Sequence, residues 1–305
     1  MAGVLDGVNQ RTQMVGQNRL ELLLFKLAGK QIYGINVFKV REVLQCPPLT
    51  QLPNGNPVVR GVAHIRGETV SVVDLSMAIG GPMLPNISNC FVVISEYNRK
   101  VQGFLVNSVE RIVNMSWGDI HPPPKGVGKN NYLTAVSEFE NGLIEIIDVE
   151  KVLSEIIPTN ETVSTGLLED SHKAPQDKVV LVADDSAVAR NQVKRTVEQL
   201  GLKTHTVING KEALDWLLGI VKQGKNVNDE VLLVISDIEM PEMDGYTFTA
   251  EVRANPDLSD LHIILHTSLS GVFNKAMIEK VGANKFIAKF DPNELAAAVR
   301  SQYDQ

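Results

Sequence analysis

Hydrophobic and polar positions follow two different rhythms along the chain. In the first half, apolar runs of five to seven residues alternate with short turns that contain Gly, Pro or Asn. Many short strands separated by turn signals, with few helices, are typical of small β-barrels. The strands predicted in this half span residues 20–26, 31–35, 70–74, 90–96, 100–106, 132–136 and 143–147.

Two segments of the first half have helical spacing instead. Val37, Val40 and Val43 recur every three residues and predict a helix over residues 36–44. A second short helix is predicted over residues 150–156.

Residues 58–75 form the most distinctive pattern of the first half. They are predicted to fold as an extended arm, a hairpin turn at Arg66-Gly67-Glu68 and a returning strand. An arginine beside a glycine in a turn is exposed and available to a carboxylate of a partner. Taken alone, the position is better explained by a solvated loop arginine.

The second half alternates strands with helices, five times. Such alternation predicts parallel strands joined by right-handed crossovers, that is, a doubly wound α/β sheet of five strands. Ligands of these sheets bind at the carboxyl ends of the strands. The predicted strands span 178–183, 203–207, 231–236, 262–266 and 285–288, and the helices span 186–200, 210–221, 246–254, 271–281 and 292–302.

The change of rhythm places a boundary within the 305 residues. Residues 158–177 are polar, lack sustained periodicity and have Pro near both ends, which predicts a mobile linker. We therefore expect an N-terminal tail over 1–18, a first domain over 19–157 and a second domain over 178–305.

The two halves of the chain differ in net charge, and this difference argues against some classes of function. Residues 1–160 hold 14 Lys and Arg and 14 Asp and Glu, whereas residues 161–305 hold 15 and 22, the whole deficit of −7. Without a basic stripe, such a chain is a poor nucleic-acid binder. No apolar run reaches membrane-span length, no secretory signal is recognisable, and two cysteines form no disulfide framework. The sequence therefore predicts a cytoplasmic protein without membrane insertion.

Acidic, hydroxyl and basic residues stand where strands of the second half end. They are Asp184, Asp185, Asp237, Thr267 and Lys289. Carboxylates crowded on one rim repel one another, and all-oxygen ligands favour Mg²⁺ as the neutralising ion. Carboxylate, Mg²⁺, lysine and hydroxyl together outline a phosphoryl-acceptor site, with Asp237 as the nucleophile. Helix N-capping is the alternative for a lone strand-end Asp, but not for all five residues.

Residues 178–302 resemble a response-regulator receiver domain. The resemblance rests on Asp184-Asp185, the Asp-x-x-Met-Pro-x-Met-Asp-Gly run from Asp237, Thr267 and Lys289. It implies phosphorylation of Asp237 and metal binding by Asp185, Asp237 and the main-chain carbonyl of Glu239. It also implies that Asp184 acts on the metal through water and that Thr267 and Lys289 engage the phosphate.

Three positions tune or depart from the receiver pattern. Phe290 follows Lys289 where most receivers have proline, the residue that favours a cis peptide bond. The sequence therefore does not decide whether the Lys289–Phe290 bond is cis. Phe286 takes the place of the aromatic switch residue. Glu239 places an acidic side chain beside the path of an attacking water, and we hypothesise that it changes the phosphoryl lifetime.

Residues 19–157 resemble a CheW-type coupling domain. The resemblance rests on the runs Ile35-Asn36-Val37-Phe38-Lys39-Val40-Arg41-Glu42-Val43, Gly61-Val62-Ala63-x-x-Arg66-Gly67 and Val73-Asp74-Leu75. That family folds as two five-stranded SH3-like barrels and binds the histidine kinase CheA and chemoreceptor tips. The implied contact positions are Arg66, Gly67, Val37, Val40 and Val43.

A coupling domain followed by a receiver is the arrangement of CheV proteins. It implies a chemotaxis scaffold, recruited to membrane-associated receptor arrays, that couples chemoreceptors to CheA and is modulated by phosphorylation rather than turning over a substrate. The alternative is a phosphate sink that drains CheA while tethered to the array. A Mg²⁺-dependent phosphohydrolase would use the same carboxylates, but the sequence lacks an evident second acid/base residue for it.

Overall fold

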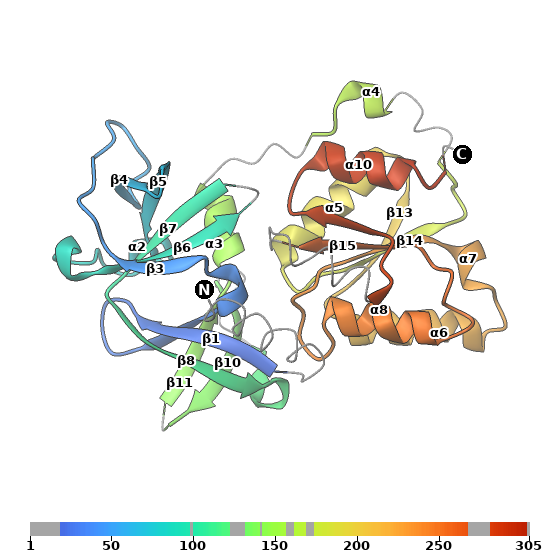
Figure 1. Ribbon diagram of the computed structural model, residues 1–305, viewed down its shortest axis with the longest axis horizontal. Helices are drawn as coiled ribbons and strands as arrows, with labels where there is room; N and C mark the ends of the chain where they lie inside the picture. The colour runs from blue at the N-terminus through green and yellow to red at the C-terminus, as the bar shows by residue number, and fades with distance from the viewer. Residues whose placement is uncertain are drawn as a thin grey trace, which may run out of the picture. The chain divides into compact units, whose positions relative to one another are not determined.

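The computed structural model describes residues 19–97, 100–122, 132–140, 142–156, 162–168, 174–267 and 281–303. They belong to two compact units, Arg19–Pro158 and a second unit that contains Thr159–Gln305 (Figure 1).

The first unit is built mainly of β-strands. Its strands are β1 (Arg19–Lys26), β2 (Ile32–Asn36), β3 (Glu42–Gln45), β4 (Val59–Ile65), β5 (Glu68–Asp74), β6 (Phe91–Tyr97), β7 (Lys100–Val106), β8 (Ser108–Ser116), β9 (Ile120–His121), β10 (Leu133–Phe139) and β11 (Gly142–Ile147). They form a six-stranded sheet, β8-β1-β2-β11-β10-β9, and a five-stranded sheet, β3-β6-β7-β5-β4. The two-sheet β-fold is therefore confirmed, and the short β9 is the strand beyond the five expected in the first sheet.

Short helices connect the strands of this unit. They are η1 (Val37–Lys39), α2 (Leu75–Ala78), η2 (Ile87–Asn89), η3 (Trp117–Asp119) and α3 (Val149–Ile156). The last of these joins the two sheets, because Val152 and Leu153 are buried in one core with Phe25 of β1, Val93 of β6 and Phe104 of β7. Burial of each such side chain contributes about 1.5–3 kcal/mol.

The helix predicted over residues 36–44 is wrong. The chain makes the single 3₁₀ turn η1 and then enters β3, whose residues pair antiparallel with β6, Val43 opposite Val93. Valine is stiff at χ1, which lowers its helix propensity and suits it to a pleated sheet. Pairing with β6 therefore decides the local structure against the helical spacing.

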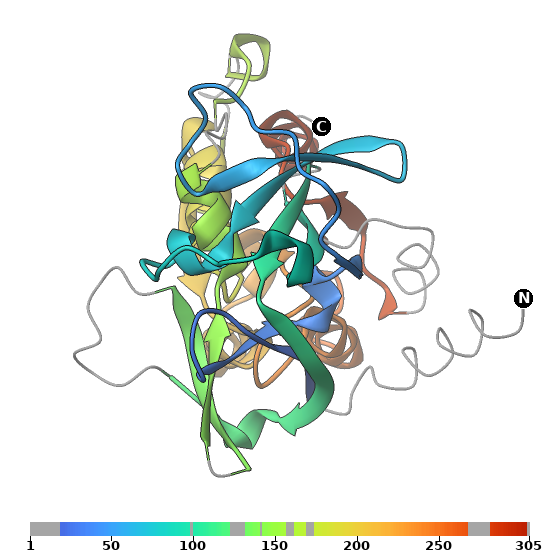
Figure 2. The same ribbon diagram turned by 90° about the vertical axis from the view of Figure 1, so that its left-hand side faces the viewer.

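The hairpin predicted at residue 66 is present as β4 and β5. Their register brings Ile65 opposite Glu68, which leaves Arg66 and Gly67 as a two-residue loop. Both loop residues have positive φ, 48° and 88°, the requirement of a type I′ turn. Figure 2 shows the hairpin as the light-blue pair of strands that ends in this tight turn.

The second unit is a doubly wound α/β domain, as predicted. Its strands β12 (Val179–Ala183), β13 (Lys203–Val207), β14 (Val231–Ser236), β15 (Ile263–Thr267) and β16 (Lys285–Ala288) are parallel in the order β13-β12-β14-β15-β16. Helices α5 (Ala187–Gln199) and α10 (Pro292–Arg300) cover one face of the sheet. Helices α6 (Gly210–Lys222) and α8 (Gly245–Ala254) cover the other, and the short α7 (Val227–Glu230) precedes β14 (Figure 1).

From β12 the chain first adds β13 on one side and then adds β14, β15 and β16 on the other. The switch point therefore lies between β12 and β14, where ligands of such sheets bind. Residues 271–280 of the helix predicted over 271–281 lie outside the described residues.

Part of the segment predicted as a mobile linker is instead packed on the second unit. Residues 162–168 include the one-turn helix α4 (Thr165–Leu168), and Val163 is only 2% exposed. Ala174 is buried in the same core. The domain boundaries themselves stay a prediction.

Among the described residues, no helix has both the length and the apolar character needed to span a membrane.

Candidate functional site

The carboxyl ends of the parallel strands carry a compact acidic cluster. Asp184 and Asp185 follow β12, and Asp237 follows β14. One carboxylate oxygen from each of the three lies within 4.8 Å of the others. Within the described part of the chain, no other group of His, Cys, Asp and Glu meets this criterion. The strands thus bring together residues that are 52 positions apart in the sequence.

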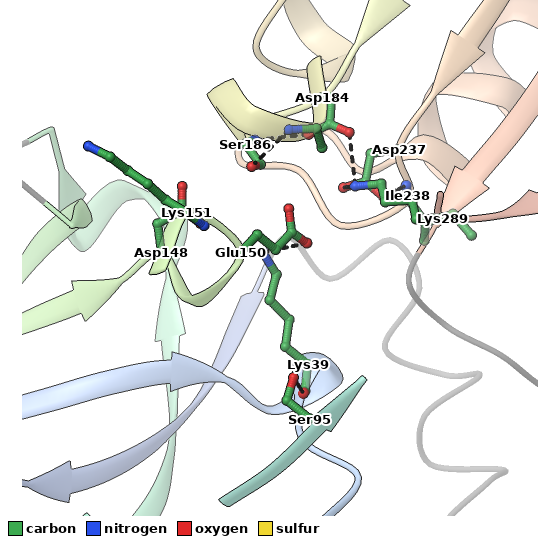
Figure 3. Close-up of polar contacts among 11 residues, drawn as sticks. Lys39, Ser95, Asp148, Glu150, Lys151, Asp184, Ser186, Asp237, Ile238 and Lys289 are labelled. Carbon is green, nitrogen blue, oxygen red and sulfur yellow. Dashed lines mark hydrogen bonds and ion pairs between the residues drawn. The ribbon is translucent and has the colours of Figure 1, made fainter. Parts of the chain in front are cut away.

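Lys289 is the cation of this cluster. Its Nζ lies 2.8 Å from Asp184 Oδ2 and 2.8 Å from Asp237 Oδ2, and all three side chains are at most 5% exposed (Figure 3). Buried charges are tolerated when they are paired in this way. One ammonium faces three carboxylates, however, so the cluster keeps an excess of negative charge.

Backbone hydrogen bonds hold both buried carboxylates in position. The Ile238 N–H donates to Asp237 Oδ1 at 2.7 Å, and the Ser186 N–H donates to Asp184 Oδ1 at 2.9 Å. Asp237 is also fixed through its backbone, because its N–H donates to Ala183 O at 2.8 Å. Each carboxylate therefore has one oxygen toward the backbone and one toward Lys289.

A divalent cation fits this arrangement. The donor set consists of carboxylate oxygens, which are hard ligands that Mg²⁺ prefers. The excess negative charge left by Lys289 is the electrostatic reason for a cation there. Asp185 is less buried than Asp184 and Asp237.

Thr267 and Lys289 are brought to the same edge by the last two strands. Thr267 is the fully buried final residue of β15, and its carbonyl accepts a hydrogen bond of 2.8 Å from the Lys289 N–H. The peptide bond between Lys289 and Phe290 is cis. Phe286 lies on β16, half-buried against the α6 and α8 side of the core.

Glu239 lies in the loop that follows Asp237, beside Tyr246 of α8. Burial, together with the charges of Glu239 and Asp244, raises the pKa of the Tyr246 phenol to about 12. The half-buried Glu239 side chain is thus close to the cluster in sequence and close to a neutral phenol in space.

Gly245 makes room for the loop that carries Asp237. A Cβ at residue 245 would overlap Asp237 O and would lie 3.0 Å from Ile238 Cα. The first residue of α8 therefore touches the backbone of Asp237 at a distance that only glycine allows.

We expect Gly245→Ala to move Asp237 away from Lys289. The extra methyl group forces the backbone apart, which should destabilise the second unit by about 1–3 kcal/mol and slow phosphoryl uptake. Gly219→Ala in α6 is the matched control, since a Cβ there meets nothing within 4 Å. Chemical denaturation and intact-mass analysis check both effects, and equal behaviour of the two variants would contradict this explanation of Gly245.

The expected contact residues of the first unit are only partly brought together. Arg66 is 80% exposed on its side chain, and its Nε donates to both oxygens of Glu42, at 2.9 and 2.8 Å. These hydrogen bonds hold the pKa of the Glu42 carboxyl below its usual value. The pair joins the hairpin turn to the edge strand β3, where Val43 is 37% exposed.

Val37 and Val40 lie elsewhere, packed partly buried against the core shared by the two sheets. The helical face that would have grouped them with Val43 does not exist. Gly67 lies in open space at the turn, with nothing within 4 Å of a Cβ. Sequence reasoning missed Glu42 as the partner of Arg66, because nothing local links positions 24 residues apart.

Comparison with known proteins assigns both units. Residues 21–156 match the CheW-like domain, and residues 180–300 match the response regulator receiver domain. The fold and the site thus define a chemotaxis coupling protein with a phosphorylatable receiver domain.

Relatives over the full length make the assignment specific. The chain is 30% identical to chemotaxis protein CheV3 of Helicobacter pylori, covering 94% of this chain and 96% of that protein. It is 29% identical to chemotaxis protein CheV1 of the same organism, covering 98% of each. Its first half is 28% identical to chemotaxis protein CheW of Klebsiella aerogenes, covering 50% of this chain and 92% of that protein. The chain belongs to the CheV family.

Proposed function

We propose that this chain couples chemoreceptors to the histidine kinase CheA and that phosphorylation of Asp237 modulates the coupling. The observation that carries the proposal is the position of the Asp237 carboxylate, held by the Ile238 N–H on one oxygen and by Lys289 on the other. It lies within reach of Asp184 and Asp185, which supplies a cation site beside the acceptor oxygen.

The proposed chemical step is transfer of a phosphoryl group from a phosphohistidine. A carboxylate oxygen of Asp237 attacks phosphorus while the P–N bond of the phosphohistidine breaks. The electron pair of the P–N bond stays on the imidazole nitrogen, which then takes a proton from water. Lys289 then exchanges Asp237 Oδ2 for an oxygen of the transferred group, because the phosphorylated carboxyl has lost its own charge. The Thr267 hydroxyl donates to a second phosphoryl oxygen. Positioning and charge stabilisation are the main needs of such a transfer.

Mg²⁺ fits the cluster and, when bound, neutralises charge on the phosphoryl oxygens. Asp185, Asp237 and the main-chain carbonyl of Glu239 would hold it, with Asp184 acting through water. These residues also orient the acceptor, since Asp184 shares Lys289 with Asp237. Phe286 is the proposed aromatic switch residue. It lies on β16, next to β15, and the proposed change of surface on phosphorylation involves these two strands.

The first domain supplies the docking surface in this proposal. Arg66, Gly67 and Val43 form its exposed part, with the guanidinium of Arg66 facing solvent while it binds Glu42. Val37 and Val40 are partly buried against the core shared by the two sheets, away from this exposed part. A partner carboxylate would compete with Glu42 for Arg66.

The domain division proposed for this function is 1–18 for the tail, 19–157 for the coupling domain, 158–177 for the connection and 178–305 for the receiver. The protein acts in the cytoplasm at receptor arrays, and it binds no nucleic acid. It is a scaffold rather than an enzyme that turns over an external substrate.

A coupling assay with receptor, CheA and this protein tests the proposal. With Asp237→Ala we expect kinase activation that no longer responds to phosphodonor, whereas the native protein should change it at least about fivefold, a typical size for coupling between two sites. Equal coupling by the native protein with and without phosphodonor would favour a phosphate sink that merely drains the kinase.

A further inference from the structure

The segment before the receiver is held on one face of the receiver by its backbone. The Val163 N–H donates to Gln199 Oε1 of α5 at 3.0 Å, and the Ser164 N–H donates to Asn293 Oδ1 of α10 at 2.8 Å. Arg300, at the end of α10, donates to Leu167 O at 3.0 Å. We call residues 162–168 the strap.

Hydrophobic contacts add to these hydrogen bonds. Val163 is 2% exposed in the core between the sheet and helices α5 and α10, and Leu167 and Leu168 pack against that core. The strap is therefore a docked element of the receiver domain.

The same core contains the residue that follows the phosphate-binding lysine. Phe290 is 7% exposed and belongs to the core cluster that includes Val163. Its ring lies edge-on to His266, 5.9 Å between centroids, and His266 directly precedes Thr267. Lys289 thus has a chain neighbour in the core cluster that contains Val163, and Thr267 has a chain neighbour that contacts this residue, Phe290.

Helix α10 provides a second connection between site and strap. Its N-cap is Asp291, two residues after Lys289, and Asn293 in its first turn holds Ser164. Lys289 on Asp237, Phe290 in the core and Asn293 on Ser164 therefore belong to one short continuous segment, residues 289–293. The docked strap fits the arrangement in which Lys289 is bound to Asp237.

Docking of the strap controls the length of the tether between the two domains. With the strap docked, only residues 157–161 separate α3 from Thr162, a reach of at most about 18 Å. With the strap released, residues 157–173 become the tether, which can extend to about 60 Å. Effective concentration of one tethered domain near the other falls steeply with tether length.

We propose that the strap is a phosphorylation-controlled clasp, docked when Asp237 is unmodified and released when it is phosphorylated. Phosphorylation then lengthens the tether between receiver and coupling domain. This inference rests on the proposed function of Asp237.

Hydrogen exchange of the full-length protein, followed by mass spectrometry, tests the clasp. With acetyl phosphate and Mg²⁺, we expect exchange of the strap amides to accelerate by about tenfold, the effect of losing one or two net hydrogen bonds. Val163→Asp should show fast exchange without phosphodonor and unchanged phosphoryl uptake, and Val163→Ile should behave like the native protein. A second test leaves Val163 in place. Asn293→Ala and Arg300→Ala each remove a side chain that binds the strap, so fast exchange of the strap amides without phosphodonor is again expected.

Intact mass measured on the same samples separates the two proposals. A protein that gains no phosphoryl group overturns the proposed function of Asp237. A fully phosphorylated protein whose strap exchanges at the unmodified rate overturns the clasp and leaves the function of Asp237 intact.

Discussion

Asp237→Asn is expected to abolish phosphotransfer from CheA, with a loss of rate of about a thousandfold or more. A carboxamide is neutral and a poor nucleophile, and its NH₂ group would face the ammonium of Lys289 if the Ile238 N–H kept its acceptor. Phosphotransfer measured by loss of label from the phosphorylated kinase checks this expectation.

Asp244→Asn is the matched control for that variant. Asp244 lies in the same loop but caps α8, accepting hydrogen bonds from the N–H and hydroxyl of Thr247 at 2.7 and 2.9 Å. Asparagine is also a good N-cap, so the fold should persist and transfer should continue. Labelling of Asp237→Asn at the native rate would show that another residue is the acceptor.

Asp74→Ala should produce the largest loss of stability in the coupling domain. Asp74 is fully buried, and its Oδ2 binds Arg60 Nη1 at 2.8 Å and the Leu84 N–H at 3.0 Å, while Oδ1 binds the Met77 N–H at 3.2 Å. Removal of Asp74 takes the carboxylate from Arg60, which keeps only the Leu84 carbonyl as an acceptor of Nη1, and takes the side-chain acceptor from two amides. Breaking such a buried network costs about 3–5 kcal/mol.

The unfolding of this domain can be followed on its own. The chain has two tryptophans, Trp117 in the coupling unit and Trp216 in the receiver, so a Trp216→Phe background leaves one probe. Glu68→Ala, an exposed change on the same strand, should alter the free energy of unfolding by less than about 0.5 kcal/mol. If Asp74→Ala were equally mild, the network would not support the fold.

The receiver was the more predictable half because its central strands, β12, β14 and β15, are buried on both faces. Runs such as 231–235 are continuously apolar, and the helices around them have clear N-caps, so the expected and observed strands differ by at most one residue at either end. The coupling domain offers weaker signals. Strand β8 was missed because Glu110, Arg111 and Asn114 are exposed within it, as in an edge strand with one solvated face.

For the site, the sequence predicted which residue types meet at the strand ends, because parallel topology alone brings them to one edge. It did not predict the contacts that depend on packing. The double contact of Lys289 with Asp184 and Asp237 and the pairing of Arg66 with Glu42 join positions far apart in the chain. The close approach of Gly245 to Asp237 depends on how the loop between them folds back. The strap was likewise read as linker, because a few apolar residues in a polar stretch give no periodic signal.

The central claim is that Asp237 accepts a phosphoryl group at a magnesium-dependent site. Native protein incubated with acetyl phosphate and Mg²⁺ tests it most directly, by intact mass followed by peptide mapping. We predict the mass gain of one phosphoryl group, mapped to Asp237 and lost when EDTA replaces Mg²⁺. Absence of any gain where an established receiver is labelled, or a gain mapped to another residue, would contradict the account.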